Sequence, residues 1–119
     1  MQIFLAAMLL ASGGAQPATE MDYADGALAY QALVQGDLKR AERQLLASRA
    51  GNGQDVAWML NYGQLLARQG RANEARAVFR RVAEAPDSEV VLASGEVIGT
   101  REASKLAARR LASQGLSAR

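Results

Sequence analysis

The stretch LAYQALVQGDLKRAERQL, from Leu28 to Leu45, is followed thirty-four residues further on by YGQLLARQGRANEARAVF, from Tyr62 to Phe79. Both stretches carry a Gln–Gly pair, an Ala five residues after the Gly, and a large apolar residue four positions after that Ala. A Gly at this place suits the turn between two helices. The pattern therefore predicts one helix–turn–helix unit that occurs twice, and its period is typical of helical repeats.

Residues 22–87, a little over half of the chain, resemble two tetratricopeptide repeats. In that family each repeat is a pair of antiparallel helices, and neighbouring repeats stack into a right-handed superhelix with a concave groove that binds a partner. The first copy departs from the pattern, because Asp25 stands where the family usually has a large aromatic residue; the second copy has Met59 there. The residues that match best lie in the second copy and are Asn61, Gly63, Leu66, Gly70, Ala75, Phe79 and Pro86.

The spacing of apolar residues predicts four helices within the two copies. Gly63 lies inside the third helix, where Gly costs about 1 kcal/mol relative to Ala, so we expect a neighbouring helix to approach it closely. Trp58 suits a buried packing role and an exposed contact with a partner equally well. The four helices are predicted at residues 21–35, from the capping residue Asp37 to about 48–50, at 55–69 and at 71–84.

The last third of the chain leaves this period. Two short runs with β-branched residues, 90–93 and 96–98, flank Ser94-Gly95 and predict a hairpin with a two-residue turn. After the hairpin, Thr100 is expected to cap a helix that extends to about Gln114.

A third helical repeat is the alternative for this region. On the same register it would place Ser104 at the position of the turn glycines and Arg109 at the position of Ala41 and Ala75. Neither residue suits its position, so the hairpin is favoured. Two repeats leave apolar faces to be covered, and the cover is either the C-terminal hairpin and helix or a second copy of the chain.

The first residues resemble an export signal. An apolar run, IFLAAMLLA, ends at the small residues Ser12 to Ala15, and Gly13 with Ala15 fits the small-x-small pattern of a cleavage site. No Lys or Arg precedes the run, which is unusual for a signal peptide. The run is also short for a membrane span of about twenty residues. We expect export with cleavage near Ala15; the alternatives are an uncleaved membrane anchor in residues 1–15 and an ordinary buried N-terminal helix.

The composition narrows the classes of function. The chain contains no Cys and no His, which removes disulfides, thiolate metal sites, and the commonest general base and metal ligand. Two carboxylate pairs, Asp22 with Asp25 and Glu84 with Asp87, have a spacing that is ordinary at helix ends and are joined by no nucleophile or phosphate-binding loop. We therefore expect no enzyme activity, no metal and no cofactor.

The resemblance implies that a partner lies along the first helix of each pair. Asn61 and Arg68 could hold a peptide carboxylate or backbone through charge-assisted hydrogen bonds, although either residue could equally serve local structure. Tyr30 is as suited to packing as to recognition. The candidate partner-binding residues are Tyr23, Tyr30, Leu60, Asn61, Gln64 and Arg68.

A basic stripe near the C-terminus gives a competing hypothesis. A cluster of this kind can attract nucleic acid or anionic lipid, but it is more often a solvated helix face. The whole chain carries a formal charge of only +2 and no aromatic residue accompanies the cluster, so nucleic acid is disfavoured. The stripe comprises Arg101, Lys105, Arg109, Arg110 and Arg119.

The sequence thus predicts a mainly α-helical, exported protein-interaction module in the periplasm or outside the cell, with a protein or peptide partner. A self-associating scaffold is the alternative function, and a basic helix that binds nucleic acid or anionic lipid is the least favoured. The expected organisation is a signal peptide at 1–15, a linker at 16–21, two tetratricopeptide repeats at 22–87, and a hairpin with a capping helix at 88–119.

Overall fold

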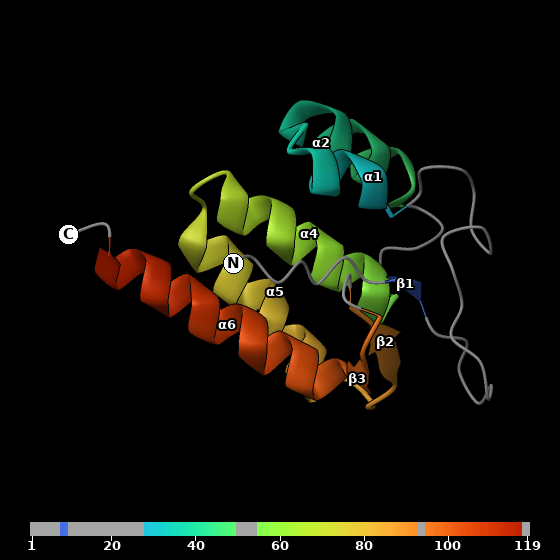
Figure 1. The fold of residues 1–119 in the computed structure, drawn as a ribbon, viewed down its shortest axis with the longest axis vertical. Coiled ribbons are helices and arrows are strands. Elements are labelled where there is room, and N and C mark those ends of the chain that lie inside the picture. The colour runs from blue at the N-terminus through green and yellow to red at the C-terminus, as the bar shows by residue number, and fades with distance from the viewer. Residues whose placement is uncertain (1–7, 10–27, 50–54, 93–94, 118–119) are drawn as a thin grey trace.

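The computed structural model describes residues 8–9, 28–49, 55–92 and 95–117, which form a mainly helical fold with one small antiparallel sheet (Figure 1). Neighbouring helices pack in chain order, so α4 lies between the first helical hairpin and the C-terminal helices. The elements are β1 (Met8–Leu9), α1 (Tyr30–Gln35), α2 (Leu38–Ala47), α4 (Val56–Arg68), α5 (Ala72–Glu84), β2 (Glu89–Val91), β3 (Val97–Gly99) and α6 (Thr100–Ser117).

The two predicted helix–turn–helix units are present, and their turns are built from the same backbone bonds. Gly36 and Gly70 both adopt the left-handed conformation, with φ of 77° and 80°. Two bonds of the first turn have a counterpart thirty-four residues later, with the same length. The pairs are Gly36 N–H to Leu33 C=O and Gly70 N–H to Ala67 C=O, 3.1 Å each, and Asp37 N–H to Ala32 C=O and Arg71 N–H to Leu66 C=O, 2.9 Å each.

The core of the second unit depends on a close crossing of α4 and α5. Gly63 lies against the ring of Phe79, as the sequence led us to expect, and a β-carbon there would overlap the ring. Ala75, Phe79 and Val82 are spaced along one side of α5 and are buried, because this spacing places them on a single helix face. α4 is buried on nearly all sides, which agrees with its central position.

Trp58 joins the two units. Its side chain is 4% exposed and its ring stacks on Tyr62, with a centroid distance of 4.9 Å. The indole N–H donates to the Leu45 carbonyl (3.1 Å) and to the Ser48 hydroxyl (3.2 Å), both at the end of α2. Of the two roles that the sequence left open, the structure shows the buried one.

The first helix is shorter than predicted. Helix was expected over 21–35, and although residues 21–27 lie outside the described part of the chain, α1 begins only at Tyr30. Ala29 adopts the left-handed conformation (φ 57°), which ends helical geometry on its N-terminal side. The carbonyl of Leu28, which would bond within a continuous helix, instead accepts a hydrogen bond from the Asn61 side chain (2.9 Å).

The hairpin is confirmed, and a third helical repeat is therefore excluded for 89–99. β2 and β3 pair antiparallel with Val90 opposite Ile98. The Leu92 N–H donates to the Glu96 carbonyl (2.8 Å), so the loop has three residues rather than the predicted two, with Gly95 at φ 91°.

A third strand joins this sheet from the other end of the chain. Met8 and Leu9 pair antiparallel with Val91 and Val90 and make the sheet order β1-β2-β3. The two residues lie within the segment predicted as a signal peptide. They are extended, which disagrees with the buried N-terminal helix considered above, while the rest of the segment lies outside the described residues.

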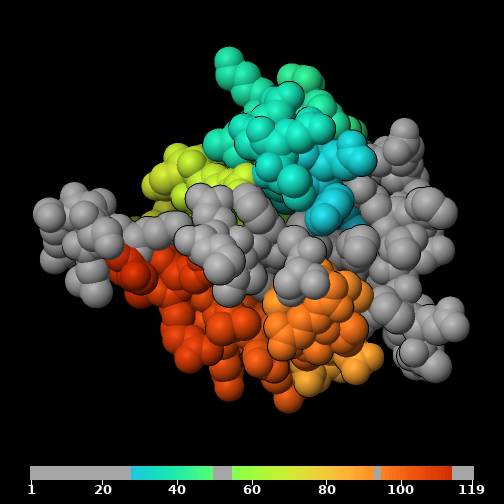
Figure 2. Space-filling model, in the orientation of Figure 1, coloured from blue at the N-terminus to red at the C-terminus, as the bar shows by residue number. Residues whose placement is uncertain are grey.

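α6 follows β3 directly and packs on α5, with a smaller contact to α4. Ala103, Ala107 and Leu111 form its buried face. α6 therefore covers a side of the second unit that the first unit leaves uncovered. Figure 2 shows this arrangement from outside, with the first unit (cyan to green) and α6 (red) on opposite sides of the visible face.

The start of α6 is capped differently from the prediction. Thr100 was expected to accept amide protons from the first turn, but its hydroxyl accepts from the Ser88 N–H (3.1 Å) and donates to Asp87. The Asp87 carboxylate accepts the Arg101 N–H (3.1 Å) and so takes the capping role. This hydrogen bond is the main reason that the pKa of Asp87 lies below its usual value.

Candidate functional site

The candidate partner-binding residues that the structure describes lie on α1 and α4, two helices that are in contact. Two hydrogen bonds from α4 hold this arrangement, one near each end of α1. Each of Tyr30 on α1 and Gln64 and Arg68 on α4 keeps part of its surface exposed, and we refer to these three residues as the α1–α4 surface. Tyr23 lies outside the described residues.

Asn61 is a structural tie in this region. Its side chain is fully buried, and its Nδ2 group donates to the Leu28 carbonyl at 2.9 Å. A buried amide without such a partner costs about 1–3 kcal/mol, so the bond fixes the chain before α1 against α4. Leu60, the preceding residue, is also fully buried. Both side chains are fully buried, so neither can contact a partner directly in this structure.

Arg68 makes the second tie and also carries the charge of the surface. Its guanidinium donates through Nη1 to the Leu33 carbonyl at the other end of α1. Partial burial, and to a smaller extent the charge of Arg110 in α6, hold the pKa of Arg68 below its usual value. The charge of Arg110 therefore acts on Arg68 and opposes its positive charge.

Gln64 stands one helical turn before Arg68, so the two side chains share a face of α4. Gln64 offers both a hydrogen-bond donor and an acceptor, Arg68 offers donors with a positive charge, and Tyr30 on α1 offers an aromatic ring with a hydroxyl. This set suits the backbone and carboxylate groups of a peptide. It provides no nucleophile or general base of the kind that hydrolytic enzymes use.

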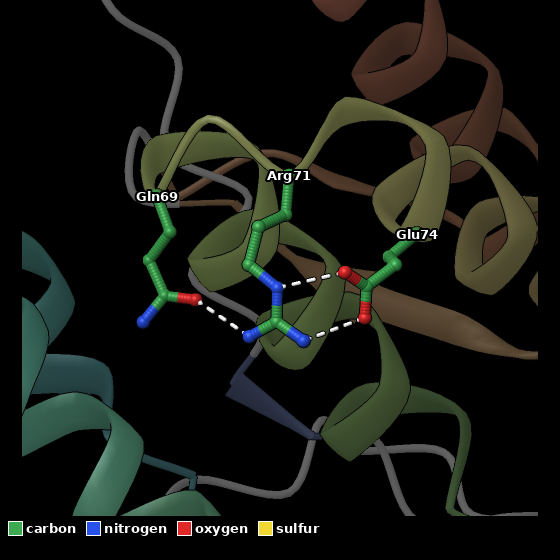
Figure 3. A network of polar contacts seen from close by, with 3 residues as sticks. All are labelled: Gln69, Arg71 and Glu74. Atoms are coloured by element: carbon green, nitrogen blue, oxygen red, sulfur yellow. Dashed lines mark hydrogen bonds and ion pairs between the residues drawn. The ribbon is translucent and has the colours of Figure 1, made fainter.

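A separate polar network lies at the turn between α4 and α5 (Figure 3). Arg71 donates to both carboxylate oxygens of Glu74, at 2.8 and 2.5 Å, and to the side-chain oxygen of Gln69 at 3.2 Å. The hydrogen bond between Arg71 and Glu74 raises the pKa of Arg71 and lowers that of Glu74. The first unit has a related contact, from Arg40 to Gln35 at 3.1 Å. These side-chain hydrogen bonds lie at the α4–α5 turn and at the α1–α2 turn.

Among the described residues, the charged side chains of the basic stripe are dispersed along α6. Arg101, Lys105 and Arg109 are exposed along α6, Arg110 is partly buried, and Arg119 lies outside the described residues. Asp22 and Asp25 also fall outside them. Where the chain is described, no group of three or more carboxylates is placed to hold a metal ion.

No helix in the described ranges is both long enough and apolar enough to cross a membrane.

The sequence did not predict that Arg110 would influence Arg68. Arg110 was grouped with the basic stripe, because it stands forty-two positions after Arg68 and shares no periodicity with it. The packing of α6 on α4 allows the charge of Arg110 to act on Arg68. No local sequence signal predicts such a contact.

Comparison with known proteins does not assign the chain to a family. No protein-family model matches the chain, and neither the curated proteins nor the solved structures include a match. The two helical units, their matched turns and the α1–α4 surface are therefore the basis for a functional hypothesis.

Proposed function

We propose that the chain is a protein-interaction module of the tetratricopeptide type, with no chemistry of its own. The observation that carries the proposal is the pair of helical turns with matching backbone hydrogen bonds thirty-four residues apart. That period and the Gly–Ala spacing are characteristic of the family. The absence of Cys and His in the sequence supports a role in recognition rather than catalysis.

The partner in this proposal is a protein or peptide that lies along the first helices of the two units. Tyr30, Gln64 and Arg68 make the contacts, while the buried side chains of Leu60 and Asn61 contribute to the packing of α4. Because the guanidinium of Arg68 is positively charged and only partly buried, the partner presents a carboxylate there. The charged contact sets orientation, and the aromatic and amide groups add local specificity.

We further propose that the module is exported, with cleavage near Ala15, and works in the cell envelope or outside the cell. The apolar run and the small residues before Gln16 support this proposal. N-terminal sequencing of the protein from its own cells tests it. A mature chain that begins at residue 16 is expected; Met1 on soluble cytoplasmic protein would refute export, and Met1 on membrane-bound protein would favour the uncleaved anchor.

Affinity capture with matched variants tests the interaction proposal. The bait is the tagged full chain, in the wild-type form, as Gln64→Ala with Arg68→Met, and as the control Arg80→Met, which removes an exposed charge from α5. Met retains the aliphatic length of Arg without its charge. We expect one partner to be captured by the wild type and the control and lost with the double variant. A partner that all three chains retain equally would refute the α1–α4 surface as its site.

Self-association is the second candidate function, and exposed apolar side chains on the first unit favour it. Val34 in α1 is 43% exposed and Leu46 in α2 is 47% exposed. Side chains of this kind can be covered by another subunit. Light scattering over a range of concentrations distinguishes the candidates, because a strict monomer excludes the scaffold.

A further inference from the structure

The central strand of the sheet, β2, has two sides, and the hairpin bonds show which residues face each side. Leu92 donates its N–H to Glu96, and Ser88 accepts from Thr100, both at 2.8 Å. In an antiparallel pair, hydrogen-bonded and non-hydrogen-bonded positions alternate. Ser88, Val90 and Leu92 therefore direct their backbone groups toward β3, whereas Glu89 and Val91 direct theirs to the opposite edge.

Met8 and Leu9 occupy that opposite edge. Met8 stands opposite Val91, which is one of the two residues whose backbone groups point there. Both residues of β1 belong to the segment that we propose is removed on export. Cleavage near Ala15 would remove β1 and leave the backbone N–H and C=O groups of Glu89 and Val91 without a neighbouring strand. An open sheet edge of this kind can pair with another strand.

We propose that this edge pairs with the β2 strand of a second copy of the chain once Met8–Leu9 is removed, so that the leader keeps the precursor monomeric. The inference rests on the proposed export. Two copies of this edge can pair with each other in an antiparallel arrangement centred on Val90. In this register the Val91 of each copy stands opposite the Glu89 of the other. Both residues of each such pair direct their backbone groups to the shared edge.

Symmetry and charge both suit a second copy as the occupant. A twofold axis beside Val90 makes the contact identical from both sides, as closed homodimers require. In this register each Glu89 faces an apolar Val91, so the two carboxylates do not stand opposite each other. Val90, the residue on the axis, is 1% exposed and already contributes to the core.

A cysteine at position 90 tests the register directly. The chain contains no Cys, so any disulfide formed by Val90→Cys joins two molecules. The Val90 residues would form a non-hydrogen-bonded pair, with Cα atoms about 4.5 Å apart, which lies within the range of about 4.4–6.8 Å that a disulfide spans. The variant is compared in three backgrounds: the full chain, the full chain with Met8→Pro, and the processed chain recovered from cells.

Met8→Pro removes the N–H with which β1 bonds to Val91 and so opens the edge without truncating the protein. We expect a covalent dimer on non-reducing gels for the processed and Met8→Pro chains, at least ten times more than for the full chain. Light scattering of the same backgrounds with Val90 intact should double the 12.6 kDa monomer mass for Met8→Pro. Arg80→Cys, exposed on α5, is the control for random collision.

Val91→Pro is the second test, because it removes an edge-directed N–H and leaves the hairpin bonds intact. Added to Met8→Pro, it should restore the monomer. A Met8→Pro chain with native circular dichroism that stays monomeric at every concentration would overturn the inference, and so would a dimer that survives Val91→Pro. If Met1 is retained in cells, the proposed export is refuted. The oligomeric state of the Met8→Pro chain still tests whether two β2 edges pair.

Discussion

Gly63 of α4 lies directly against the aromatic ring of Phe79 in α5. A β-carbon at Gly63 would come within 2.9 Å of two ring carbons and closer still to a third. This contact sets the distance between the two helices of the second unit. It also explains why a helix otherwise rich in Leu and Ala carries Gly at this position.

Gly63→Ala should therefore destabilise the protein by about 1–3 kcal/mol, the usual cost of overpacking a core. At an unobstructed helix position the same change would stabilise by about 0.5–1 kcal/mol. Urea denaturation followed by circular dichroism measures the difference. Adding Phe79→Leu, which replaces the ring with a smaller side chain, should recover part of the loss. A Gly63→Ala chain more stable than the wild type would disprove the close approach.

Trp58→Phe should destabilise the protein by about 1 kcal/mol. The change keeps an aromatic ring to stack on Tyr62 but removes the N–H that bonds to Leu45 and Ser48. Trp58→Ala, which also empties the ring's space, should cost about 3–5 kcal/mol. Because Trp58 is the only tryptophan, wild-type fluorescence reports the docking of the two units directly. Emission typical of a water-exposed indole in the native state would contradict its burial.

Asp87→Asn should weaken the dependence of stability on acidic pH. The Arg101 N–H lowers the pKa of Asp87 in the folded protein relative to about 3.9 in the unfolded chain. The folded state thus releases this proton more readily, and the associated stability is complete above about pH 5 and lost as the pH falls through 4 toward the folded pKa. Urea midpoints between pH 6 and pH 3 measure the effect. Glu84→Gln, an exposed carboxylate of α5, is the matched control, and equal pH profiles for Asp87→Asn and wild type would refute the cap.

Asn61→Ala should lower the stability of the protein, whereas Gln64→Ala should leave it nearly unchanged. The first removes the buried donor to Leu28 and should destabilise the protein by about 1–3 kcal/mol, with faster amide exchange in α1. The second changes a partly exposed side chain and should leave the free energy of unfolding within about 0.5 kcal/mol. Hydrogen exchange and urea denaturation measure both. If Asn61→Ala left α1 as protected as in the wild type, the tie between α1 and α4 would be wrong.

Local signals in the sequence predicted the helical units well. Gly36 and Gly70 marked both turns, Asp37 marked a cap that the structure confirms, and Gly95 marked the hairpin loop. Each of these features depends on the conformation or hydrogen bonding of residues a few positions apart. The relation to tetratricopeptide repeats, the export signal and the binding role stay predictions.

Contacts between distant segments could not be predicted in the same way. β1 pairs with a strand about eighty residues further along the chain, and Asp87 caps a helix that begins thirteen residues later. The left-handed Ala29 was missed because Ala favours helix and its neighbours are apolar. For the candidate site, the sequence predicted a partner-binding role for Asn61 and Arg68 and left a local structural role as the alternative. Packing shows that both side chains bond to backbone carbonyls, of Leu28 and Leu33, while the partner-binding role stays a prediction.

The measurement that tests the proposed function most directly is site-specific photocrosslinking in the cells that make the protein. A photoreactive phenylalanine analogue replaces Gln64 on the α1–α4 surface or, as the control, Arg80 on the exposed side of α5. The account predicts one discrete adduct with another protein from position 64 and none from position 80. Adducts from position 80 alone, or no adduct from position 64 in cells where the chain is folded and abundant, would contradict it.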